Sequence, residues 1–280
     1  MISLGMTATE LVINQSGSNG TDIYVSKLSA NGHNLLGSTY VGGSSNDGIS
    51  YLVSSGSYDN ANKYDSLTTN YGDQFRGEIM IDSLGNCLIA SCTRSVDFPT
   101  LNPFQASLAG QQDGVIFKLS SNLSTMLWSS YFGGSNNDAC YSVKIDSSYN
   151  VVFAGGTSSS NLPGTVGGLN PSYLSGKCDG FVGKLTPNGQ TLIQSTYIGT
   201  DNYDQVFFVE INRNDEVFLL GQSRGGNFPV VNSQSYPGSS QFIAKLTPEL
   251  DSILNSTVFG NGNPEINISP AAFLVDICGN

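Results

Sequence analysis

The chain repeats one sequence pattern four times. Each copy opens with a short apolar run that ends in Lys-Leu, and ten residues after that Leu comes Ser-x-x followed by an apolar residue and Gly. The copies span residues 22–43, 113–134, 179–199 and 241–260. A repeat of this kind decides the architecture, because each unit must bury its apolar face against its neighbours.

Several landmarks give the same period. Pro99 to Pro163 is 64 residues, Pro163 to Pro229 is 66, and Lys118 to Lys184 is 66. The interval from Lys27 to Lys118 is 91, so the first junction carries a surplus of 20 to 30 residues, which we place at 49–73. The sequence therefore predicts one domain over 1–280, with a partial unit at 1–48, full units at 74–138, 139–204 and 205–265, and a partial unit at 266–280.

Within a unit the apolar runs are short and are separated by turn residues. In the third unit, strands are predicted at 141–145, 151–154, 181–185 and 191–198. Thr186-Pro-Asn-Gly189 predicts a hairpin between the last two. No segment keeps a helical period. Four antiparallel strands per unit, repeated radially, predict an all-β fold of the β-propeller type, since this arrangement leaves only short sheet edges.

The repeated residues also resemble a known family. Asp179-Gly-Phe-Val-Gly-Lys-Leu-Thr-Pro-Asn-Gly189, followed by Ser195-Thr-Tyr-Ile-Gly199, is similar to the SBBP family of seven-bladed β-propeller repeats. Val143-Lys-Ile-Asp-Ser-Ser148 and the Phe-Pro steps at 98–99 and 228–229 add to the resemblance. It implies a repeat protein of bacterial secreted or cell-surface proteins, often beside adhesion-type domains. The family has no catalytic residues to transfer.

The resemblance implies that the strand before the Asp-x-x-x-Asn turn is the innermost one. On that basis residues 2–7, which echo 153–157, are expected to form the second strand of the first blade. Residues 272–276 are expected to form the innermost strand of a fifth unit. These two segments could close a ring of four blades. The chain could equally be a fragment of a longer array.

The composition limits where the protein is expected to act and which classes of partner it can bind. Hydrophobic residues make up 39% of the chain but form no long run, so no transmembrane helix is expected. No segment reads as a signal peptide, and an export signal would lie outside this chain. Eleven basic residues against 22 acidic ones give a net charge of -11, which disfavours nucleic acid as a partner. We expect an extracellular or cell-surface protein with no membrane insertion, whose partners are a glycan, a surface protein or neighbouring domains.

The cysteines have neither CxxC nor zinc-type spacing. They are Cys87, Cys92, Cys140, Cys178 and Cys278. We expect them to be small buried core residues, with a Cys140–Cys178 disulfide as the alternative.

Two other residue types favour a structural role. His33, the only histidine, follows Asn31-Gly32 and is expected in a hairpin turn. Lysine recurs once per unit at positions 27, 118, 184 and 245. We expect these lysines to form a solvated stripe that protects a sheet from edge pairing.

A carboxylate recurs after the Ser-x-x-apolar-Gly motif of each unit. The four positions are Asp47, Asp138, Asp204 and Glu265, with Asp73 as a second choice in the first unit. A closed ring would gather them on one face near its axis, where they could bind calcium, which takes six to eight oxygen ligands. Alternatively, each carboxylate caps its own turn. No cofactor is expected apart from this calcium candidate.

The insertion breaks the repeat and is the candidate ligand-binding segment. It carries Tyr51, Tyr58, Tyr64 and Tyr71 among Ser, Asn and Asp. Aromatic rings can stack on sugars, and function often lies in irregular loops on a rigid scaffold. A loop without function, or one that contacts a neighbouring domain, is the alternative.

Catalytic residues are hard to find. One histidine in a turn excludes a Ser-His-Asp triad or a Cys-His pair. A pair of loop carboxylates, as in glycoside hydrolysis, is the remaining enzymatic route. The sequence therefore favours a non-enzymatic extracellular repeat module that acts as a scaffold or binds glycan or protein. A secreted carbohydrate-active enzyme that uses loop carboxylates is the alternative.

Overall fold

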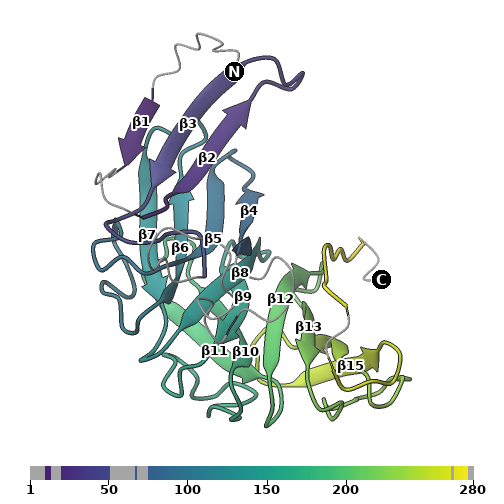
Figure 1. The fold of residues 1–280 in the computed structure, drawn as a ribbon. Coiled ribbons are helices and arrows are strands. Elements are labelled where there is room, and N and C mark those ends of the chain that lie inside the picture. Colours follow the sequence, from purple (N-terminus) through teal and green to yellow (C-terminus); the bar gives the residue numbers. More distant parts are fainter. Residues whose placement is uncertain (1–9, 14–19, 51–66, 68–74, 266–267, 277–280) are drawn as a thin grey trace.

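The computed structural model describes residues 10–13, 20–50, 67, 75–265 and 268–276 (Figure 1). These residues contain fifteen β-strands and no α-helix. Accordingly, no helix in this part of the chain is long and apolar enough to cross a membrane. The predicted all-β class is confirmed.

Three sheets have four strands each, with neighbouring strands antiparallel. Each runs from its first to its fourth strand in chain order, as in a propeller blade. The second-unit sheet comprises β4 (Glu78–Ile81), β5 (Cys87–Thr93), β6 (Asp113–Leu119) and β7 (Met126–Phe132). The third comprises β8 (Asp138–Ile145), β9 (Val151–Thr157), β10 (Asp179–Leu185) and β11 (Leu192–Ile198). The fourth comprises β12 (Asp204–Ile211), β13 (Val217–Ser223), β14 (Gln241–Leu246) and β15 (Ile253–Phe259).

The third sheet shows why these residues form strands. β9 and β10 are buried along their whole length, which suits short, continuous apolar runs between two neighbouring sheets. The hairpin predicted between β10 and β11 is present, and Gly189 supplies the positive φ of 70° that its turn requires. The Thr186 hydroxyl donates to the Asn188 side chain across this turn.

The first sheet is built differently. It contains β1 (Glu10–Ile13), β2 (Ile23–Leu28) and β3 (Leu35–Val41) in the order β1-β3-β2. β2 and β3 are antiparallel and match the third and fourth strands of the other sheets, whereas β1 is parallel to β3. Among the described residues, β2 is therefore the last strand of this sheet, at the side where two inner strands stand in the other units. The strand expected at 2–7 lies outside the described residues.

The innermost strand expected at 272–276 is wrong for this structure, because these residues form no strand. A strand needs a sheet edge to pair with, and this segment instead follows an anchor at Pro270, whose carbonyl accepts a hydrogen bond from Arg76 Nη1 at 3.2 Å. Leu274 is 79% exposed. Within the described part of the chain, the sheets therefore pack one against the next without a closed ring.

The core lies between successive sheets. One cluster joins Val25 and Val41 of the first sheet to β5 and β6, a second joins the second and third sheets, and a third joins the third and fourth. β5 contacts β8 and β9 contacts β12, so adjacent blades pack face to face. In the second cluster, the Phe132 ring lies 4.8 Å from the Phe153 ring and 4.9 Å from the Phe181 ring.

The described cysteines are core residues, as predicted. Cys87, Cys92, Cys140 and Cys178 are buried and form no disulfide, so the Cys140–Cys178 alternative is wrong. Cys278 lies outside the described residues. His33 is exposed in the turn between β2 and β3, also as predicted.

Candidate functional site

The insertion contributes one described residue, Leu67. Its side chain is fully buried, and its carbonyl accepts hydrogen bonds from Gln205 Nε2 at 2.6 Å and from the Tyr203 hydroxyl at 3.4 Å. Leu67 is thus anchored on the β12 side of the fourth blade. Residues from three blades surround Leu67, namely Cys92, Ala139, Tyr141, Cys178, Tyr203 and Phe207. The candidate ligand-binding residues Tyr51, Tyr58, Tyr64 and Tyr71, and also Asp73, lie outside the described residues.

Asp138, the first residue of β8, is fully buried and its carboxylate accepts three hydrogen bonds. Gly134 N donates to Oδ2 at 2.7 Å, and the Ser159 hydroxyl donates to the same oxygen at 2.8 Å. The Thr157 hydroxyl donates to Oδ1. One carboxylate therefore ties the end of the preceding blade to the first two strands of its own.

The same arrangement recurs at the first junction. Asp47 accepts from Gly43 N at 2.7 Å, from the Ser95 hydroxyl at 3.0 Å and from the Thr93 hydroxyl. It lies 1% exposed.

A close variant stands at the third junction. Asp204 is fully buried and accepts from Thr200 N at 2.7 Å and from the Thr200 hydroxyl. All three aspartates use their oxygens within the protein, as expected for turn-capping residues.

Glu265 does not share this environment. It is exposed and forms an ion pair with Arg224 at 2.8 Å. The described residues contain no group of three or more His, Cys, Asp or Glu side chains that could hold a metal ion. Calcium binding by Asp47, Asp138, Asp204 and Glu265 stays a prediction without a matching ligand cluster in the described part of the chain.

A second carboxylate accompanies the first in each of the first three units; it is fully buried at Asp113 and Asp179 and half-buried at Asp22. Asp113 starts β6 and accepts from Ala109 N, Gly110 N and Gln105 Nε2. Asp113 and Asp138 flank Gly133 so closely that a Cβ there would lie 2.7 and 2.8 Å from their oxygens. Asp22 and Asp47 flank Gly42 in the same way.

These second aspartates open three copies of the repeat, and the sequence alone assigned them no role. The available signal was their recurrence at the start of the third strand in three of the four units, at Asp22, Asp113 and Asp179. The repeat therefore encodes a pair of carboxylates in these units. The spacing after the Ser-x-x-apolar-Gly motif identifies only one of the two.

Burial sets the protonation of these groups. Removal from water raises the pKa of Asp138 to about 7 and that of Asp179 to about 8, although hydrogen bonds to each carboxylate oppose the rise. For the same reason the pKa values of Asp47, Asp113 and Asp204 are raised to about 6. Near neutral pH these aspartates are close to their titration points.

We expect the protein to be more stable at about pH 5 than at about pH 8. The folded-state pKa values of about 6 to 8 lie above the ordinary aspartate value of 3.8, so this stabilisation is complete below pH 3.8 and is lost as pH rises through 6 to 8. At Asp82, burial raises the pKa, but hydrogen bonds from Lys118 and Asn86 outweigh it and lower the pKa to about 2, so its contribution is lost in strong acid.

Thermal unfolding followed by circular dichroism from pH 4 to pH 9 measures this profile. Asp179→Asn should flatten the alkaline fall, because it removes the group with the highest pKa of the set. A midpoint that increases between pH 5 and pH 8 would contradict the assignment.

A charged cluster joins the innermost strands of three blades. Lys144 on β8 pairs with Glu78 on β4 and, at 3.5 Å, with Glu210 on β12. Glu78 Oε2 also accepts from the Ser142 hydroxyl at 2.6 Å and from Val143 N at 2.8 Å. Burial raises the pKa of Glu210, and the Lys144 charge opposes the rise. No sequence signal pointed to this cluster, because Lys144 and Glu210 hold one repeat position with opposite charges and Glu78 stands two residues earlier in its unit.

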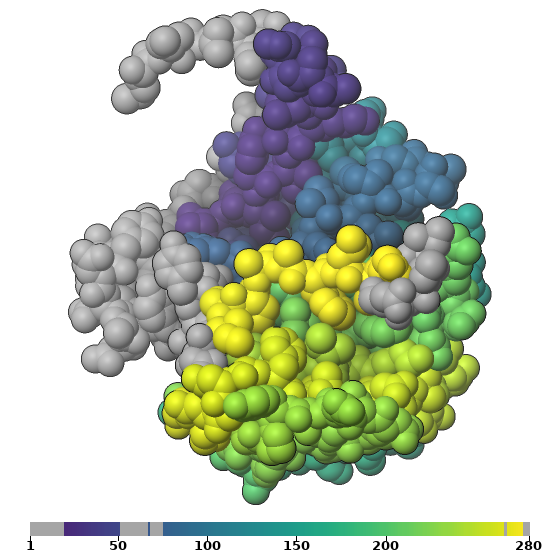
Figure 2. Space-filling model, turned by 90° about the vertical axis from the view of Figure 1, so that its right-hand side faces the viewer, coloured from purple at the N-terminus to yellow at the C-terminus, as the bar shows by residue number. Residues whose placement is uncertain are grey.

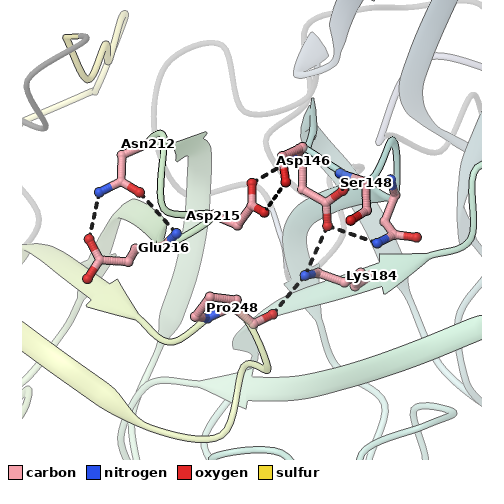
Figure 3. Close-up of polar contacts among 9 residues, drawn as sticks. Asp146, Ser148, Lys184, Asn212, Asp215, Glu216 and Pro248 are labelled. Atoms are coloured by element: carbon pink, nitrogen blue, oxygen red, sulfur yellow. Dashed lines mark hydrogen bonds and ion pairs between the residues drawn. The ribbon is translucent and has the colours of Figure 1, made fainter.

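The solvated stripe expected of the recurring lysines is wrong at Lys184. Lys184 is buried, contacts Asp146 at 3.2 Å and donates to the Pro248 carbonyl at 2.8 Å (Figure 3). Ser147 N donates to Asp215 Oδ1 at 2.8 Å beside it. These contacts join the turns of the third blade to those of the fourth, because a buried ammonium needs acceptors that only the neighbouring turns provide.

A groove of about 360 Å³ separates the first sheet from the second. One wall is β2, from Ile23 to Ser26, and the other is formed by residues 77–79 and 89–91 of the second blade. Tyr24 is 52% exposed on the first wall, and its ring lies 5.0 Å from that of Tyr40. Glu78 of the charged cluster lies on the second wall.

Comparison with known proteins does not assign the chain to a family. No protein-family model matches the chain, and no curated protein matches it. The resemblance to SBBP repeats therefore remains a prediction from the repeated residues.

Proposed function

We propose that this chain is a non-enzymatic β-propeller repeat module of a large bacterial secreted or cell-surface protein, where it acts as a scaffold that binds glycan or protein. The observation that carries the proposal is the use of the recurring carboxylates. Asp47, Asp138 and Asp204 recur once per unit and direct their oxygens at backbone and hydroxyl donors. Carboxylates whose oxygens accept internal hydrogen bonds in this way stabilise the fold.

The other acidic groups also favour binding over hydrolysis. Glycoside hydrolysis needs one accessible carboxylic acid and one accessible carboxylate at a controlled separation. Asp113 and Asp138 are close together, but both are fully buried. Glu78 and Glu210 both pair with Lys144, so each carboxylate is held in the charged cluster. A peripheral ligand held by aromatic side chains of the insertion fits this arrangement better.

The same proposal treats the four sheets as blades of a propeller, complete at four or part of a larger array. The resemblance to SBBP repeats and the packing of successive sheets support it. The expected location is outside the cell.

The ligand role predicts that an immobilised panel of soluble polysaccharides will retain the protein without releasing sugar products. Replacing Tyr58 and Tyr64 by alanine should weaken retention about tenfold, because stacked aromatic rings are lost. Tyr236→Ala is the control, since Tyr236 is exposed in the fourth unit, outside the insertion. Release of products that stops on Glu210→Gln would instead establish the carbohydrate-active enzyme.

A further inference from the structure

One position of the repeat carries a different kind of side chain at the second junction, between the second and third blades. At each of the three junctions, the residue after the second strand of the blade donates its backbone N–H to the loop that precedes the blade. The three bonds, each 2.9 Å long, run from Arg94 N to Asn46 O, from Ser158 N to Asn137 O and from Arg224 N to Tyr203 O. The position therefore holds arginine at two junctions and serine at the second.

The third junction shows how a guanidinium group is accommodated at this position. Arg224 Nη2 forms an ion pair with Glu265 at 2.8 Å, and its Cζ lies 5.9 Å from the centroid of the Tyr203 ring. Glu265 belongs to the C-terminal part of the chain, whose yellow atoms lie against the yellow-green fourth unit in Figure 2. The guanidinium group thus stands beside Tyr203, the residue that corresponds to Asn137 at the second junction.

The second junction has a hollow where the other two carry an arginine. The hollow has a volume of about 300 Å³ and is lined by Gln111, Asn136, Asn137 and Ser158. This volume is at the lower end of the range for small-molecule sites, roughly 300–1,000 Å³. The short side chain of Ser158 leaves the space open, and none of the four lining residues carries a charge.

The hollow is bordered by hydrogen-bond acceptors that have no donor. Asn137 Oδ1 is buried and has no hydrogen-bond partner among the described residues. The same holds for Oε1 of Gln112, which is fully buried and forms a bridge with Asn137. Asn136 Nδ2 is already used, since it donates to the Ser158 carbonyl at 2.9 Å. A buried acceptor without a donor is unfavourable, so the hollow is suited to a group that donates.

We propose that this hollow binds the guanidinium group of an arginine side chain on a partner protein. The inference rests on the proposed binding module and specifies the chemistry of its partner. The incoming guanidinium replaces the side chain that Arg94 and Arg224 supply at the other junctions and donates to Asn137 Oδ1.

Arginine fits the hollow better than a sugar does. A guanidinium group carries five N–H donors and no acceptor, which matches acceptors that lack a donor, whereas a sugar hydroxyl is both donor and acceptor. The repeat itself places arginine at this position twice. The net charge of -11 also attracts a cationic partner rather than an anionic one.

Amide NMR spectra of the labelled full-length chain, recorded during titration with a short peptide, test the assignment. The probe is Gly-Arg-Gly blocked at both ends, and the matched control peptide carries citrulline, which has nearly the same shape without the charge. The arginine peptide should shift the amide signals of Asn137 and Ser158 in a saturable way. It should bind about tenfold more tightly than the citrulline peptide, because hydrogen bonds from a charged donor are stronger.

A substitution that fills the hollow provides the second arm. Ser158→Arg should supply the guanidinium from within the chain and weaken binding of the arginine peptide about tenfold. Ser172→Arg adds the same charge at an exposed serine of the third unit, outside the hollow, and should bind like the parent. Thermal unfolding should give both variants a midpoint no lower than that of the parent, so that a loss of binding is not a loss of fold.

Three results would overturn the assignment. One is equal affinity for the arginine and citrulline peptides, which needs no variant to fold. Another is binding of free arginine without binding of the blocked peptide, since the ligand would then be a small molecule. The third is a methyl glucoside that shifts the same amides as strongly, which would make the hollow a glycan site. Polysaccharide retention through Tyr58 and Tyr64 is measured separately, so its failure is distinguishable from each of these results.

Discussion

Replacing Asp138 with alanine is expected to lower the free energy of unfolding by about 3–5 kcal/mol. The substitution leaves three buried donors, Gly134 N and the hydroxyls of Thr157 and Ser159, without their acceptor. Each unsatisfied buried donor costs about 1–3 kcal/mol, and partial relaxation keeps the sum below the maximum. Urea unfolding followed by fluorescence at pH 7 measures the loss.

Two companion variants separate hydrogen bonding from charge. Asp138→Asn keeps one acceptor oxygen, and because the pKa of Asp138 is about 7 it resembles a state already populated at neutral pH. We therefore expect it to cost only about 1–2 kcal/mol. Glu249→Ala, at an exposed position, should stay within about 0.5 kcal/mol of the parent. An Asp138→Ala variant as stable as the Glu249 control would contradict a structural role for the carboxylate.

Replacing Phe181 with alanine should cost about 3–5 kcal/mol, which tests the packing between blades. Phe181 belongs to β10 of the third blade and is fully buried, yet its ring lies 4.9 Å from Phe132 on β7 of the second. The substitution opens a cavity at a blade interface, where both sheets resist collapse. Equilibrium unfolding should also remain a single transition, since neighbouring blades share one core.

Phe181→Leu should lose less, about 1–2 kcal/mol, because most of the buried volume stays filled. Leu84→Ala, at an exposed turn position, is the control and should change little. If Phe181→Ala split the unfolding curve into two transitions, the second and third blades would be independent units. That outcome would contradict a continuous core.

The repeat itself made most of the fold predictable. The recurring Lys-Leu and Ser-x-x patterns predicted the four-stranded sheets, because period-2 runs separated by Pro/Asn/Gly turns are typical of antiparallel strands. The hairpin at Thr186–Gly189 followed from turn chemistry alone. The ends of the chain were not predictable in this way. A strand such as 272–276 exists only when a sheet edge lies beside it, and that depends on tertiary geometry.

The candidate site was predictable only where it repeats. Asp47, Asp138 and Asp204 were found by spacing, and the structure shows what their oxygens contact. The charged cluster of Glu78, Lys144 and Glu210 was not found, because a contact between three different strands leaves no trace in a single repeat period. Lys184 was misjudged for a related reason, since its acceptor at Pro248 belongs to the next blade.

The most direct test of the account is a double-mutant cycle between Asp138→Asn and Thr157→Val, measured by urea unfolding both with excess calcium and with a chelator. If the carboxylate works as an acceptor within the fold, the two sites should be coupled by about 0.5–3 kcal/mol, with the same value in both solutions. Additive effects, or a coupling that appears only with calcium, would show that the recurring aspartates serve something other than the hydrogen bonds between blades.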